Sequence, residues 1–136
     1  MSPGDALAQA AQTLAGTRYR LHGRDPRTGL DCVGLLAAAL RAIGREAPAP
    51  SRYGLRNRDI AGALAFAPLA GLVDAPGPVR SGDVLLVRPG PLQHHLLIAG
   101  AAGDFIHAHA GLRRVTVTPE PHGWPILRHW RLSAID

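Results

Sequence analysis

The order in which two kinds of apolar pattern follow one another constrains this chain most. In the first 45 residues, apolar side chains recur at helical spacing, whereas from residue 83 onward short apolar runs alternate with turn residues. The runs cover residues 83–88, 95–99, 104–109, 113–117 and 126–132, and each has the length of a β-strand. Helices followed by strands predict an α+β fold, in which N-terminal helices pack on a C-terminal antiparallel sheet.

Local signals place the helices before that sheet. Residues 3–15 have apolar residues at helical spacing. A second helix is predicted to begin at Cys32 and to end at Gly44. Asp31 is suited to cap it, because an aspartate side chain accepts a backbone N–H of the first turn. A short third helix is predicted over residues 59–66, after a surface connection rich in Pro and Arg.

Length, charge and the apolar runs limit the class of protein. The chain has 136 residues, which suits one domain spanning residues 1–136. Its 15 basic residues are all arginine, and the net charge of +5 suits an anionic partner such as nucleic acid or a cell-wall polymer. The N-terminus lacks the features of a secretory signal, and apolar runs are too short to span a bilayer. We therefore expect a soluble protein made in the cytoplasm, without membrane insertion.

The single cysteine is placed for chemistry. Cys32 falls in the first turn of the predicted second helix, where unpaired N–H groups and the positive end of the helix dipole favour a thiolate. This position predicts a lowered pKa for the thiol. A cysteine nucleophile also needs a base, and a third group that orients the base. The alternative is a cysteine that simply packs in the core.

Histidines in the predicted sheet can supply both groups. If the hairpin turns about Ala101, His95 falls opposite His107 on the same face, with Cβ atoms about 4.5 to 5.5 Å apart. His94 then points to the other face, and His109 shares the face of His107. The pattern therefore favours His95 as a general base and His107 as the residue that orients it.

Four sequence blocks follow one another along the chain: GTRYRLHGRDPRTGLDCVGLL, RSGDVLLVR, QHHLLIAG and FIHAHAG. In this order they resemble the NlpC/P60 cell-wall cysteine peptidases, and within that family the compact versions encoded by phages and phage-like gene transfer particles. The resemblance implies a papain-like fold with Cys32 as nucleophile, His95 as base and His107 as third catalytic residue. It also implies that Tyr19 and Asp31 lie at the substrate, and that no cofactor is needed. The implied substrate is a peptidoglycan stem peptide, cleaved after D-γ-glutamate, and the implied partners are phage-tail-like proteins.

The chain departs from the family at positions near the expected substrate. Val33 replaces the serine that commonly follows the cysteine, and Leu21 and His22 stand where the family usually has Trp-Gly. The resemblance is therefore stronger for the catalytic set than for the residues that choose the substrate.

Other interpretations remain open from the sequence. A non-catalytic phage-tail assembly or wall-binding module of the same fold is one; a nucleic-acid binder has only the arginine content in its favour. His107 and His109 form an H-x-H pair that, with Cys32, has the residue types of a zinc site, although zinc would then occupy the nucleophile. Asp31 has two compatible roles, helix cap and substrate contact. Trp124 is interpreted as packing and His129 as a surface residue.

Overall fold

The computed structural model describes residues 1–45, 66–91, 93–119 and 123–134. Helix α1 (Pro3–Thr13) is capped by Ser2, whose side chain accepts the Asp5 amide, and helix α2 (Cys32–Ala42) is capped by Asp31. Both predicted helices are thus confirmed. The third predicted helix, over residues 59–66, lies outside the described residues except for Phe66.

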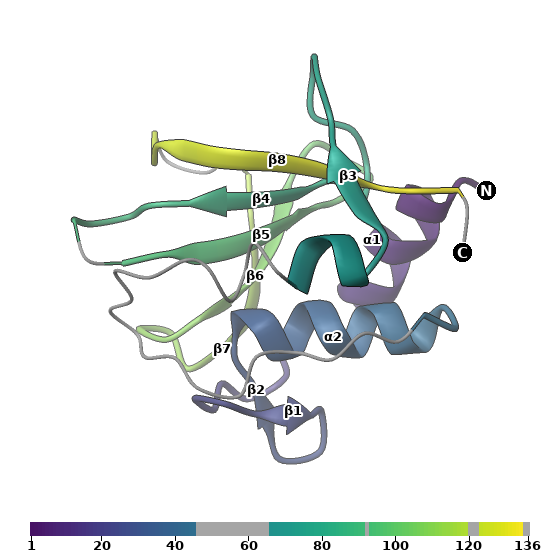
Figure 1. Cartoon of the computed structure of the whole chain (residues 1–136). Coiled ribbons are helices and arrows are strands. Elements are labelled where there is room, and N and C mark those ends of the chain that lie inside the picture. The colour runs from purple at the N-terminus through teal and green to yellow at the C-terminus, as the bar shows by residue number, and fades with distance from the viewer. Residues whose placement is uncertain (46–65, 92, 120–122, 135–136) are drawn as a thin grey trace.

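A six-stranded antiparallel sheet forms the rest of the fold (Figure 1). Its strands are β3 (Leu72–Asp74), β4 (Val84–Val87), β5 (His95–Ala99), β6 (Phe105–His109), β7 (Arg114–Thr118) and β8 (Ile126–Leu132). The spatial order is β3-β8-β4-β5-β6-β7, so β4 to β7 form a meander and β8 returns to pair with β4. The five predicted strands are found within one residue at each end, whereas β3 was not predicted.

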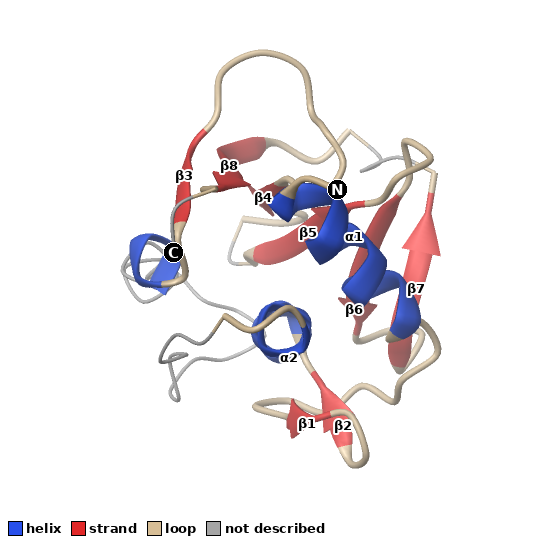
Figure 2. Ribbon diagram, turned by 90° about the vertical axis from the view of Figure 1, so that its right-hand side faces the viewer, coloured by secondary structure: helices blue, strands red, loops and turns tan. Residues whose placement is uncertain are grey.

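The segment before α2 also contains a small hairpin. Strands β1 (Arg24–Asp25) and β2 (Gly29–Leu30) pair within what the sequence predicts to be a loop. Helix α2 lies between this hairpin and the large sheet in both views (Figure 1, Figure 2). The start of α2 is thereby enclosed by two separate parts of the chain.

Successive residues of a strand point to opposite faces of the sheet, and apolar side chains form a cluster on each face. The larger one joins the helices to the sheet, and it includes Leu7, Leu35, Leu96, Ile98 and Ile106. The smaller one lies on the other face. It consists of Leu85, Val87, Leu97, Ala99 and Phe105, with Trp124 packed against them. Burial on both faces explains why the central strands are almost continuously apolar.

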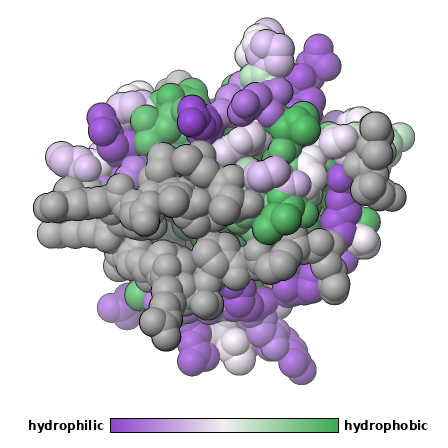
Figure 3. Space-filling view, in the orientation of Figure 1, coloured by the Kyte–Doolittle hydropathy of each residue, from purple (hydrophilic) through white to green (hydrophobic). Residues whose placement is uncertain are grey.

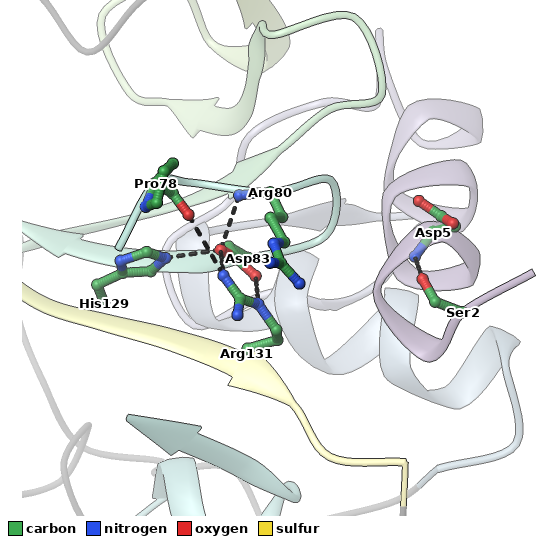
Figure 4. A network of polar contacts seen from close by, with 7 residues as sticks. All are labelled: Ser2, Asp5, Pro78, Arg80, Asp83, His129 and Arg131. Carbon is green, nitrogen blue, oxygen red and sulfur yellow. Dashed lines mark hydrogen bonds and ion pairs between the residues drawn. The ribbon is translucent and has the colours of Figure 1, made fainter. Parts of the chain in front are cut away.

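A buried carboxylate links β4 to β8. Asp83 is fully buried and accepts hydrogen bonds from Arg131 Nε and Nη2, both at 2.9 Å, and from His129 Nε2 at 2.6 Å (Figure 4). The interpretation of His129 as a surface residue is therefore wrong, because its side chain is only 16% exposed and binds Asp83.

The surface is polar where the small hairpin lies. On the face shown in Figure 3, hydrophilic side chains gather along the lower margin, over the β1–β2 segment. Among the helices of the described ranges, none is both long and apolar enough to cross a membrane.

Candidate active site

Asp31 holds the start of α2. Its Oδ1 accepts the amide of Gly34 at 2.8 Å, and its Oδ2 accepts the amide of His22 at 2.7 Å. Arg24 Nη1 lies 3.1 Å from Oδ1 and forms an ion pair with it. The predicted cap is confirmed, and the carboxylate, only 2% exposed, also fastens the preceding loop to the helix.

The loop that precedes α2 lies close to the helix because residue 34 is a glycine. A Cβ atom built at this position would lie 1.9 Å from the carbonyl oxygen of Gly23. No side chain fits in that space, so only glycine lets the loop lie against the first turn of α2. The contact places the loop that carries Tyr19 beside Cys32.

Cys32 is the first residue of α2 and is half-buried. Burial raises the pKa of its thiol to about 11, and the neighbouring Asp31 carboxylate acts in the same direction. Backbone amides oppose this increase, among them that of Leu96, the residue after His95, so the sulfur lies at the start of β5. The predicted low pKa was wrong, because burial and the capping carboxylate outweigh the backbone amides that favour the thiolate.

Tyr19 stands next to this thiol. The residue is half-buried against the larger apolar cluster, and its amide donates to the carbonyl of Arg113 at 2.9 Å. Burial raises the pKa of the phenol above its usual value, with further contributions from Cys32 and Asp31. The hydroxyl therefore stays protonated and can donate a hydrogen bond beside the sulfur.

His95 and His107 contact each other directly. His95 Nε2 lies 2.9 Å from His107 Nδ1, and the two rings are nearly perpendicular at 77°. On its other side, His107 Nε2 lies 3.3 Å from Oγ1 of Thr118. If His107 donates from Nε2 to Thr118, its Nδ1 accepts from His95, which then carries its proton on Nε2 and has Nδ1 as a base.

The register of this hairpin differs from the prediction. Ile98 pairs with Ile106, so the turn is centred on Ala102, one residue later than predicted. His95 and His107 are consequently not direct partners but diagonal neighbours on the same face, a distance that aromatic side chains span. The predicted pairing was wrong, whereas the predicted contact is present. Moving the centre of the turn by one residue moves the partner of each strand residue by two positions. Because two is an even number, His95 and His107 stay on the predicted face.

Two residues near the histidine pair were not recognised as part of the site from the sequence. Trp124 meets both rings edge-on, with centroids 6.1 Å from His95 and 6.2 Å from His107. Thr118 contacts His107 from the neighbouring strand. Neither has a local sequence signal, because Thr118 lies on β7 and Trp124 just before β8, both distant from His95 along the chain.

The surroundings also determine the charge of His95. Burial lowers its pKa to about 3, and His107 and His109 contribute in the same direction. At neutral pH the ring is therefore uncharged. The site at rest combines a neutral thiol, a neutral imidazole and a neutral phenol.

His109 has a different environment from His107. Its Nδ1 accepts the amide of Leu112 at 3.1 Å, and its ring centroid lies 5.6 Å from that of His107. Within the described part of the chain, no three His, Cys, Asp or Glu side chains are grouped so that they could hold a metal ion.

Comparison with known proteins identifies the fold. No protein-family model matches the chain, and no curated protein matches it. Solved structures do: NlpC1 from Trichomonas vaginalis has a TM-score of 0.65 at 20% identity, over 96% of this chain and 45% of that one. The NlpC/p60 domain of the peptidoglycan hydrolase SagA has a TM-score of 0.61 at 22% identity, over 90% and 95%. The chain has the NlpC/P60 fold.

A third solved structure extends the comparison. The peptidoglycan hydrolase RipB from Mycobacterium tuberculosis has a TM-score of 0.57 at 22% identity, over 95% of this chain and 64% of that one. This chain spans about half the length of the Trichomonas proteins. The predicted papain-like α+β fold is confirmed by these neighbours.

Proposed function

We propose that this protein is a cysteine peptidase that hydrolyses an amide bond in peptidoglycan stem peptides. The observation that carries the proposal is the 2.9 Å contact between His95 and His107, at the strand whose Leu96 amide faces the Cys32 sulfur. The names of two structures with the same fold, SagA and RipB, describe them as peptidoglycan hydrolases, which supports the substrate class.

The first half of the reaction acylates Cys32. His95 Nδ1 accepts the thiol proton as the sulfur attacks the amide carbonyl, so that a sulfur–carbon bond forms and the carbonyl oxygen becomes an oxyanion. The oxyanion returns its electron pair, the carbon–nitrogen bond breaks, and His95 transfers its proton to the leaving amine. The raised pKa of Cys32 and the lowered pKa of His95 mean that this proton moves during attack rather than before it.

The second half returns the enzyme to its starting state. Water attacks the thioester while His95 takes a proton from it, and the sulfur–carbon bond breaks as that proton passes to the thiolate. His107 holds the ring of His95 through both halves and does not itself exchange protons with the substrate.

Stabilisation of the oxyanion is assigned to the helix start and to Tyr19. The backbone N–H groups of Cys32 and Val33 lie at the sulfur, and the protonated Tyr19 phenol supplies a further donor beside it. Asp31 acts on the substrate indirectly, by fastening the loop that carries Tyr19.

The more detailed assignment follows from the sequence blocks that resemble the family. We propose cleavage after D-γ-glutamate, by a protein carried in a phage-like particle with phage-tail-like proteins and acting at the cell wall. Val33, Leu21 and His22 are the positions at which substrate choice is expected to differ from that of the family.

Mass analysis of purified muropeptides tests the proposal. The wild type is expected to release products that locate the cleaved bond, whereas Cys32→Ser is expected to fold normally and to release none, because a hydroxyl is a weaker acid than a thiol and gives up its proton to His95 less readily during attack. Circular dichroism of the variant serves as the folding control. Turnover by folded Cys32→Ser would refute the assignment of Cys32 as the nucleophile. A wild type that binds muropeptides without cleaving them would favour a non-catalytic module of the same fold.

A further inference from the structure

Arg18 and Arg114 face each other at the outer edge of the sheet. The segment that carries Arg18 runs antiparallel to β7, and the amides of Tyr19 and Val115 donate across the gap at 2.9 and 2.7 Å. These two hydrogen bonds flank the Arg18–Arg114 bridge, which is therefore a pair of the non-hydrogen-bonded kind. In such a pair the Cα atoms lie about 4.5 Å apart and the side chains are on the same face.

His109 continues this row on the other side of Arg114. The two residues are partners in the β6–β7 ladder, so Arg18, Arg114 and His109 lie side by side on one face. That face is also the face of His107, because residues two apart in a strand point the same way. His109 Nδ1 accepts a backbone amide, so a neutral ring carries its proton on Nε2 and offers a donor.

The positive charges of Arg18 and Arg114 repel each other across the strand pair. Both arginines are exposed, and neither forms an ion pair with a carboxylate of the described residues. Like charges placed directly opposite each other destabilise a strand pair. An anion bound between them would remove that repulsion, and a guanidinium group matches the geometry of a carboxylate.

We propose that Arg18, Arg114 and His109 bind a carboxylate of the peptide substrate beside the candidate active site. The proposal rests on the proposed function and deepens it, since it names the group of the substrate that is recognised. The location supports a substrate group, because the row begins at His109, whose ring centroid is 5.6 Å from that of His107.

Kinetics with one muropeptide in two forms test the proposal. The first form has free carboxylates, and in the second they are amidated. For the free form, Arg18→Gln and Arg114→Gln are each expected to raise KM about tenfold with kcat unchanged, as for loss of a hydrogen bond to a charged group. For the amidated form both variants should match the wild type. Arg128→Gln, an exposed arginine on β8, is the matched control for net charge and should stay within about twofold.

Calorimetric binding to the Cys32→Ser protein separates this proposal from the proposed function. If the wild type cleaves nothing but binding to Cys32→Ser still weakens with either arginine change and with amidation, the proposed function fails and the carboxylate site stands. Binding that ignores amidation, or that falls as much with Arg128→Gln, overturns the site even if cleavage is intact. Both arginine variants should be at least as stable as the wild type, and a lower Tm would assign the arginines a structural role instead.

Discussion

Replacing Asp83 by asparagine tests the buried connection between β4 and β8. The carboxylate accepts two hydrogen bonds from Arg131, one from His129 and one from the Arg80 amide at 2.8 Å (Figure 4). An asparagine offers one acceptor and turns an NH₂ group toward donors. Breaking a buried ion pair costs about 3 to 5 kcal/mol. Because the Arg131 side chain is 27% exposed and reaches water, we expect the lower value, about 3 kcal/mol, and a Tm lower by about 10 °C.

The effect is expected to depend on pH. Burial raises the pKa of Asp83, but the hydrogen bonds from Arg131, His129 and Arg80 outweigh burial and hold the pKa below its usual value. A carboxyl with a lower pKa in the folded state stabilises the fold above its unfolded pKa, about 3.9, and loses that contribution as the pH falls through the folded pKa. The difference between wild type and variant should thus be full at pH 7 and shrink below about pH 4.

Urea unfolding of both proteins at several pH values measures these quantities. Asp25→Asn is the matched control, because Asp25 pairs with Arg27 at 2.9 Å on the exposed surface, where such a pair contributes less than about 1 kcal/mol. Muropeptide cleavage by the folded Asp83→Asn protein should be unchanged, since the network does not contact the histidine pair. Destabilisation no larger than that of the control, or independent of pH, would refute the reasoning.

Three further predictions concern the candidate site itself. His95→Ala should lower kcat/KM at least about 10²-fold and His94→Ala hardly at all, and the reverse result would remove both His95 and His107 from their roles. His107→Asn should retain part of the activity that His107→Ala loses, while His109→Ala should leave kcat near the wild-type value; equal loss in all three variants together with inactivation by EDTA would indicate a metal site instead. Alkylation of Cys32 by iodoacetamide should keep rising far above neutral pH, with its midpoint near the thiol pKa of about 11, and a plateau by pH 7 would show a preformed thiolate.

The sequence by itself determined the elements that depend on neighbours along the chain. Asp31 before Cys32 predicts a capped helix start, because the capping hydrogen bond spans only three residues. Short apolar runs separated by turn residues predict strands within one residue of where they lie, since strand length and turns are local. These signals also brought Cys32, His95 and His107 together as one candidate set.

Only the tertiary structure decided how those elements meet. The register of β5 and β6 depends on the conformation of one turn, so counting residues placed His95 opposite the wrong partner although it chose the right face. Thr118 contacts the histidines from a neighbouring strand and Trp124 from a position just before β8, which no local pattern reveals. Burial raises the pKa of Cys32 although the residue begins a helix, because desolvation depends on everything packed around the sulfur and not on one helix alone.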